Sequence, residues 1–227
     1  MSAKNQLRNA FRSHLSALAP DADVLAALNA NVVQLLTQII SNLNFASSVD
    51  HKSVNGKTRR FWAAFQPAHH EPDIRAAVEQ LALGDTEVCW VFPTVERKNL
   101  QFYRPFKIDS FKRGEWGILE PDPQASEKVS LHEIQGFLIP ALAFDIQGNR
   151  LGRGAGYYDR TLADASLIDK NPIKIGVGFD SQLANHALPA DDFDVPMNWI
   201  VTESRSIETL KHIAADVPAT GRRGSIL

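Results

Sequence analysis

The chain has 227 residues, of which 44% are hydrophobic and 22% charged, and its formal net charge is −2. These values are ordinary for a globular protein with a sizeable core, and nothing in them favours binding to nucleic acid or to a membrane. A single cysteine, Cys89, excludes an internal disulfide framework. Because the N-terminus is polar and no apolar run approaches the roughly 20 residues of a membrane span, we expect a cytoplasmic protein.

The first predicted helix, residues 3–18, combines an apolar stripe with a column of cations. Leucine and phenylalanine recur at helical spacing, and Lys4, Arg8 and Arg12 follow one another at intervals of four. Like charges stacked in this way cost a few tenths of a kcal/mol per pair in an isolated helix. A solvated basic face is the commoner meaning of such a column, and a bound anion is the alternative. The column alone does not decide between them.

Apolar runs alternate with helical patterns along the rest of the chain, which is typical of α/β proteins. The predicted helices are 23–43, 72–84, 157–167 and a brief one at 207–213. The predicted strands are 60–65, 87–92 (ended by Pro93), 100–106, 137–144, 173–179 and 199–202. Three connections read as irregular or polar, 44–59, 107–116 and 121–133. We therefore predict one three-layer α/β/α domain, residues 1–213, with a mostly parallel, Rossmann-like sheet and a flexible C-terminal tail, 214–227.

The stretch from Asn149 to Arg160 reads NRLGRGAGYYDR and lies between a predicted strand and a predicted helix. Glycines let backbone N–H groups approach an anion, and a helix N-terminus adds a partial positive charge. For the glycines alone, a flexible turn would be the better interpretation. The arginines, which can grip phosphate with two parallel bonds, and Asp159, which can hold a metal, favour phosphate chemistry.

Two further positions are candidates for binding. Glu71 follows the first predicted strand, and ligands of open α/β sheets collect beyond the carboxyl ends of strands. His69 and His70 precede it, but neighbouring loop histidines seldom chelate one ion, and no HExxH motif is present. Trp116 lies between two glycines, where it is equally well interpreted as a stacking platform for a flat ligand or as a packed loop anchor.

Landmarks spread in order over roughly residues 3–205 resemble the 5-formyltetrahydrofolate cyclo-ligase family. They are the Lys4–Arg8 spacing, Glu71, the strand ending at Pro93, Gly-Ile-Leu-Glu-Pro at 117–121, the long signature from Pro140 to Asp159, and the segment from Asp194 to Glu203. The sequence departs from the family at Ala155, where relatives carry lysine or glycine, and at Phe193, where histidine is common.

The resemblance implies that ATP and Mg²⁺ drive the closure of 5-formyltetrahydrofolate to 5,10-methenyltetrahydrofolate through a phosphorylated formyl group. It implies ATP ligands at Lys4, Arg8, Arg150, Gly152, Arg153, Gly154, Gly156 and Tyr158. It assigns phosphoryl transfer to Arg150 and Arg153, and Mg²⁺ to Asp159 with Asp194 as second candidate. It places folate against Glu71, Trp116 and Tyr157.

A relative that binds ATP or folate without closing the ring is the main alternative, because a fold does not guarantee a function. The presence of Lys4, Glu71, Arg150 and Asp159 together favours the active enzyme. A nucleic-acid-binding module is disfavoured by the net charge of −2 and by the lack of a known binding motif. We expect a monomer whose partners are 5-formyltetrahydrofolate and ATP.

Overall fold

A computed structural model of the chain describes residues 2–46, 53–54, 57–84, 88–107, 110–114, 117–166 and 171–210. The helices are α1 (Ala3–Ala17), α2 (Ala22–Ala46), α3 (Arg75–Leu83) and α4 (Tyr157–Ser166). The main sheet contains β3 (Arg60–Ala63), β4 (Val88–Glu96), β5 (Asn99–Pro105), β8 (Ser126–Val129), β9 (Ile134–Pro140), β12 (Ile173–Val177), β13 (Trp199–Val201) and β14 (Ser206–Glu208). Three small hairpins pair β1 (Ser53–Val54) with β2 (Lys57–Thr58), β6 (Phe111–Arg113) with β7 (Leu119–Pro121), and β10 (Ala143–Phe144) with β11 (Arg150–Leu151).

The eight strands of the main sheet follow the order β14-β13-β12-β9-β3-β4-β5-β8. The five from β13 to β4 run parallel, and the strands at both edges are antiparallel. From β3 the chain passes to β4 on one side, whereas β9 lies on the other side of β3. The sheet therefore changes winding direction between β3 and β9, and ligands of open α/β sheets bind beyond the carboxyl ends of strands at such a point.

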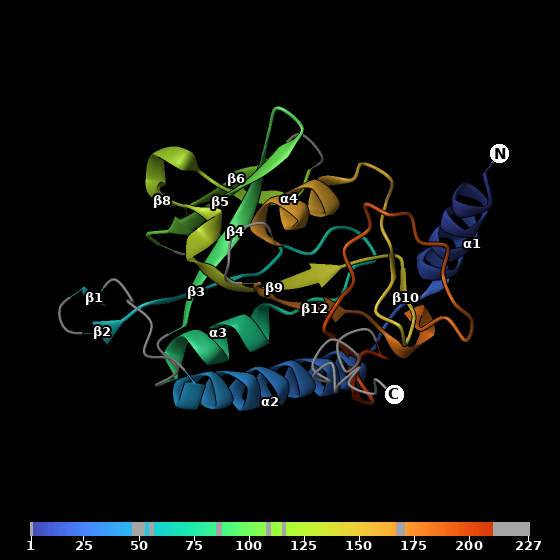
Figure 1. Ribbon diagram of the computed structural model, residues 1–227, viewed down its shortest axis with the longest axis horizontal. Helices are drawn as coiled ribbons and strands as arrows, with labels where there is room; N and C mark the ends of the chain where they lie inside the picture. Colours follow the sequence, from blue (N-terminus) through green and yellow to red (C-terminus); the bar gives the residue numbers. More distant parts are fainter. Residues whose placement is uncertain are drawn as a thin grey trace, which may run out of the picture.

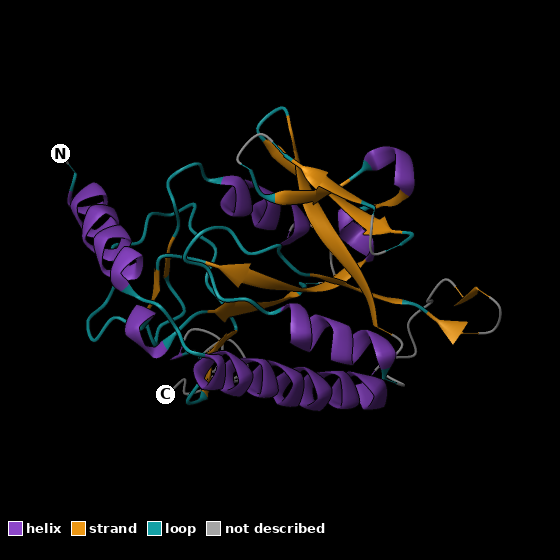
Figure 2. Cartoon of the chain, turned by 180° about the vertical axis from the view of Figure 1, so that it is seen from behind, coloured by secondary structure: helices purple, strands orange, loops and turns teal. Residues whose placement is uncertain are grey.

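Helices cover both faces of the sheet, which confirms the predicted three-layer α/β architecture (Figure 1). Helices α2 and α3 lie on one face, where they pack against Trp62 and Leu138. Helix α4 lies on the other face with Phe61 and Phe137. Neighbouring residues of β3 and of β9 thus point into opposite layers, as the two-residue period of a strand requires. Helix α1 lies apart from both layers, at one end of the molecule (Figure 2).

Helix α2 is long and apolar enough to pass as a membrane span, with a mean hydropathy of 1.5 over its window within Ala22–Leu43. This corrects the expectation that no segment of the chain approaches such a length. Its apolar face is occupied in the fold, since Leu28, Val32 and Leu36 are buried against the sheet. A core helix passes the same test of length and composition, so the finding is weak evidence for a span.

Several predicted boundaries are wrong. Strand β4 continues through Pro93, because among the described strands its only ladder partner beyond Val91 is β5, and proline is tolerated where a strand has no ladder partner on its other side. Residues 206–208, placed mostly in a helix by the sequence pattern, form strand β14 against β13. The expected polar connector 121–133 contains the edge strand β8. The predicted tail, 214–227, and Trp116 lie outside the described residues.

Candidate functional site

The segments that follow β3 and β9 meet at the point where the sheet changes direction. Arg153, in the glycine-rich segment after the β10–β11 hairpin, donates from Nε to Glu71 Oε1 at 2.9 Å and from Nη2 to the carbonyl of His69 at 3.1 Å. The other carboxylate oxygen of Glu71 accepts the N–H of Ala68 at 2.9 Å. Glu71 is thus fixed from both sides, and two residues 82 apart in the chain share one ion pair.

A buried carboxylate, Asp145, shapes the turn that leads to Arg150. It is 2% exposed and accepts the N–H groups of Gln147 and Asn149, each at 2.9 Å, and that of Leu188 at 2.7 Å. Gly148, with φ +92°, completes the turn, since a Cβ there would lie 2.6 Å from the carbonyl of Met197. Sequence reasoning assigned Asp145 no role, although an Asp three residues before a glycine is a typical turn signal.

Arg150 and Asp159 form a buried ion pair between β11 and the first turn of α4. The guanidinium of Arg150, whose side chain is 4% exposed, donates to Asp159 Oδ1 and to the carbonyl of Val195. Asp159 is 28% exposed, and its place in the first helical turn suits a negative charge. Burial fixes the cation in one orientation and leaves its carboxylate partner within reach of solvent.

The glycine-rich segment lies against helix α1. Gly154 and Gly156 have φ values of +108° and +67°, which L side chains rarely adopt. Arg8 Nε donates to the carbonyl of Gly152 at 3.1 Å, and Arg12 Nη2 to that of Arg153 at 2.7 Å. A cavity of about 390 Å³ between helix and loop is lined by Asn5, Arg8, Asn9, Arg12, Arg153 and Gly154.

Lys4 bonds to two carboxylates of the loop that precedes β13. Its ammonium lies 2.6 Å from Asp191 Oδ2 and 2.6 Å from Asp194 Oδ2. Burial alone would lower the pKa of Lys4, but its hydrogen bonds to these carboxylates outweigh burial and raise the pKa. Burial likewise opposes ionisation of Asp194, yet Lys4 and the N–H of Asp191 lower its pKa. A predicted phosphate ligand and a predicted metal ligand are therefore paired with each other.

The two tyrosines that begin α4 have different surroundings. The Arg160 guanidinium lies over the ring of Tyr157, 5.4 Å from its centroid. Burial of the phenol, reinforced by the charge of Glu71, raises the pKa of Tyr158, so its hydroxyl stays neutral at physiological pH. Tyr158 is thus a neutral phenol within the electrostatic reach of Glu71, and the ring of Tyr157 lies under a guanidinium.

The oxygen donors that the fold provides decide where Mg²⁺ could bind. Among the described residues, no group of three His, Cys, Asp or Glu side chains could hold a metal. Mg²⁺ does not need such a group, since it keeps several waters and binds one or two carboxylates together with substrate phosphates. Asp159 fits this chemistry because its carboxylate is partly exposed at the glycine loop. Asp194 fits less well, since Oδ2 already accepts from Lys4 and from the N–H of Asp191.

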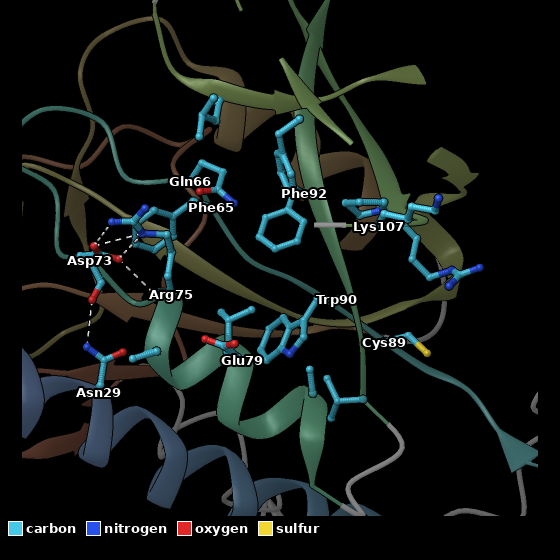
Figure 3. Close-up of a pocket in the computed structure, with 18 of the residues that line it drawn as sticks. Asn29, Phe65, Gln66, Asp73, Arg75, Glu79, Cys89, Trp90, Phe92 and Lys107 are labelled. Carbon is cyan, nitrogen blue, oxygen red and sulfur yellow. Dashed lines mark hydrogen bonds and ion pairs between the residues drawn. The ribbon is translucent and has the colours of Figure 1, made fainter. Parts of the chain in front are cut away.

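A larger, aromatic cavity of about 1090 Å³ lies between α3 and strands β4 and β5 (Figure 3). Phe65, Trp90 and Phe92 point into it, and the ion pair of Asp73 with Arg75 lies at one side. Gln66 and Asp73, which line the cavity, stand in the sequence at the two ends of the loop that carries Glu71. Sequence reasoning missed this cavity; the alternate aromatic residues of β4 were its only signal.

The structure brings together most of the predicted site residues in two neighbouring groups. Glu71, Arg150, Arg153 and Asp159 lie at the carboxyl ends of β3 and β9, and Lys4 and Arg8 reach the adjoining loops from α1. These contacts show proximity and leave each residue's role a prediction. Arg12, Arg160, Asp145 and Asp191 belong to the same region and were not among the predicted site residues.

Comparisons with known proteins agree with this architecture. A model of the 5-formyltetrahydrofolate cyclo-ligase family matches residues 1–203. The chain is 38% identical over 153 residues to the 5-formyltetrahydrofolate cyclo-ligase of Mycolicibacterium smegmatis, a match that spans 65% of this chain and 76% of that protein. The cyclo-ligase of Escherichia coli K12 is 30% identical over 144 residues, 63% of this chain and 78% of its own. The NMR structure of Aquifex aeolicus 5,10-methenyltetrahydrofolate synthetase is similar, with a TM-score of 0.66, 26% identity and coverage of 100% and 96%.

Proposed function

The chain belongs to the 5-formyltetrahydrofolate cyclo-ligase family of enzymes, and we propose that it closes 5-formyltetrahydrofolate to 5,10-methenyltetrahydrofolate at the expense of ATP, with Mg²⁺. The formyl oxygen attacks the γ-phosphorus, and the bond to the β-phosphate oxygen breaks to release ADP. The folate N10 then attacks the activated formyl carbon. Loss of the phosphorylated oxygen as phosphate, with the N10 proton passing to solvent, leaves the methenyl bridge.

The proposed sequence removes one chemical obstacle, which is that an amide oxygen is a poor leaving group. Phosphorylation makes it a good one, so the protein's task is to position the γ-phosphate and to offset charge as it transfers. Bound Mg²⁺ would neutralise charge on the phosphate oxygens, with Asp159 as its carboxylate ligand.

The observation that carries the proposal is the pair of anchored arginines at the point where the sheet changes direction. The buried Arg150 forms an ion pair with Asp159, and Arg153 donates hydrogen bonds to Glu71 and to the carbonyl of His69. Each guanidinium has N–H groups beyond those that it donates to the protein, which would bond to a phosphate, and anchoring keeps it in place without reorganisation during transfer. In this proposal Arg150 and Arg153 stabilise the transferring group, while Lys4 and Arg8 bind the remaining phosphates.

The folate is proposed to enter from the aromatic cavity. Its walls include Phe65, Trp90 and Phe92, which suit a flat ring system, and its volume of about 1090 Å³ exceeds the ~300 Å³ of the smallest ligand pockets. The lining residues Gln66 and Asp73 stand at the two ends of the loop that carries Glu71, whose carboxylate would bind the polar edge of the pterin. Tyr157 and Trp116 remain proposed neighbours of the same ring.

The test is to mix purified protein with 5-formyltetrahydrofolate, ATP and Mg²⁺ and to follow the absorbance of the methenyl product together with ADP. We expect one ADP per product, and no product when either ATP or Mg²⁺ is omitted. Normal ATP binding without product would overturn the proposal in favour of the alternative, a relative that binds its ligands without ring closure. Product formed at the same rate without ATP would refute the phosphorylated intermediate.

A further inference from the structure

Three carbonyl oxygens of the glycine loop accept hydrogen bonds from arginines of two helices, α1 and α4. Arg8 and Arg12 of α1 bond to the carbonyls of Gly152 and Arg153 at 3.1 and 2.7 Å. From within α4, Arg160 Nη1 donates to the carbonyl of Ala155 at 3.0 Å. Three carbonyls within four consecutive residues therefore each face a guanidinium.

The peptide geometry then determines where the neighbouring N–H groups point. In a planar trans peptide the C=O and the following N–H are directed to opposite sides. The N–H groups of Arg153, Gly154 and Gly156 thus point away from the arginines that hold the carbonyls before them. None of the three donates to an acceptor among the residues that the structure describes. Together with the positive φ of Gly154 and Gly156, this arrangement is typical of an anion-binding backbone nest.

We propose that Arg12 and Arg160 are positioning residues that turn the N–H groups of the glycine loop towards the polyphosphate of the nucleotide. This inference rests on the proposed function. Arg8 makes the same kind of contact, but it is already an expected ATP ligand, so the proposal concerns the other two. Neither residue touches the phosphate; each removes a carbonyl oxygen from the side on which the anion binds.

The second anchor of Arg160 explains how the loop is held rigidly. Its Nη2 donates to the carbonyl of Lys98 at 2.6 Å, in the tight turn between β4 and β5, where Arg97 and Lys98 both have positive φ. One guanidinium thus joins the glycine loop to a hairpin of the main sheet. Arg12 holds the loop from the opposite element, helix α1. The loop is fixed between a strand turn and a helix, which is the preorganisation that anion binding by backbone donors requires.

These contacts can be removed without unfolding the protein. Arg12 and Arg160 are exposed, and exposed polar contacts add little to stability. Alanine is moreover the best helix former, so Arg12→Ala does not weaken α1. Conservative variants are informative, since a lysine can replace the one bond of Arg12 but cannot span the two carbonyls held by Arg160.

The experiment measures binding of a non-hydrolysable ATP analogue with Mg²⁺ by calorimetry, and KM and kcat in the turnover assay. We expect Arg12→Ala and Arg160→Ala to weaken nucleotide binding about tenfold or more, with kcat at saturating ATP changed by less than about threefold. Arg12→Lys should recover most of the affinity, and Arg160→Lys should not. Arg205→Ala is the matched control, because it removes an exposed, ion-paired arginine at another place and should bind like the parent.

Parental affinity in both alanine variants would refute the proposal, and so would an equal loss in Arg205→Ala. Failure of the parent protein to bind the analogue would refute it as well, because the loop would then be no nucleotide site. A parent that binds the analogue but forms no methenyl product would overturn the proposed function alone. The two hypotheses therefore fail in different measurements.

Discussion

Replacing Asp159 by asparagine keeps the shape of the side chain and removes the negative charge that faces Arg150. The guanidinium, in a side chain that is 4% exposed, then keeps the carbonyl of Val195 as an acceptor and loses its charged partner. Removal of one partner from a buried ion pair costs about 3 to 5 kcal/mol, because the remaining charge is uncompensated. Since Asp159 itself is 28% exposed and one acceptor persists, we expect a loss at the lower limit, about 3 kcal/mol.

That free energy can be converted into a shift of the unfolding temperature. For a chain of this size, each kcal/mol lowers Tm by about 2 to 4 °C, so the variant should melt roughly 6 to 12 °C below the parent. If Asp159 also ligates Mg²⁺, turnover should fall by about 100-fold or more, because the charge on the transferring phosphate loses its metal. Differential scanning calorimetry and the methenyl assay measure the two effects separately.

The double variant Arg150→Met with Asp159→Asn separates the two roles. It leaves no buried charge, and replacement of a buried ion pair by uncharged groups of similar volume is often nearly neutral. We therefore expect Tm to return most of the way to the parental value, while turnover stays lost. A parental Tm in the single variant would refute the burial argument, and parental turnover would refute the metal assignment.

Two further predictions concern α1 and the glycine loop. The pKa of Asp194 is lowered in the folded protein and that of Lys4 is raised. Their ion pair therefore stabilises the fold between about pH 4 and pH 10.5, the pKa values of the two groups in the unfolded chain. This stabilisation is lost as the pH falls below that range or rises above it. Lys4→Met should thus lower Tm at pH 7, with a difference that shrinks below about pH 4; a constant difference would contradict this. Gly156→Ala should cost about 1 to 2 kcal/mol in urea unfolding, since a φ of +67° strains an L side chain, whereas Gly152→Ala, in open space, should cost little. An equal loss of stability in the two variants would contradict the backbone strain expected from Gly156→Ala.

Helices and the parallel part of the sheet could be predicted because their patterns are local. The apolar stripes of α1 and α2 repeat at helical spacing, and the observed helices end within a few residues of the expected bounds. Strands β9 and β12 are mostly apolar, with Gln135 and Lys174 as their polar residues, and so resemble strands that are buried on both faces. These signals need no knowledge of the neighbouring elements.

The antiparallel edges could not be predicted in the same way. Whether Pro93 ends a strand depends on whether β3 still lies beside it, which is a property of the assembled sheet. The apolar residues that begin with Ile207 have a spacing compatible with a helix, but Ile207 pairs with Ile200 of β13 and its segment therefore forms a strand. In both places, tertiary pairing overrides local preference.

The candidate site was predictable in its residues and less so in its contacts. The family signature predicted Arg150, Arg153 and Asp159 as a group, and the structure places them together. The cation column of α1 was expected to face an anion or solvent. Arg12 instead binds a backbone carbonyl, and Lys4 binds Asp191 across a separation of 187 residues. No periodicity encodes such contacts, because they depend on how distant loops are folded against the helix.

The docking of α1 also has a consequence for the order in which the protein becomes competent during synthesis. This helix leaves the ribosome well before its partners, which are Gly152, 144 residues after Arg8, and Asp194, 190 residues after Lys4. At about 5 to 20 residues per second, the helix waits on the order of 10 to 40 s for the last of them. Nascent chains that stop before that point lack the complete contact set of α1, so the proposed nucleotide site is assembled only when translation of the domain is nearly finished.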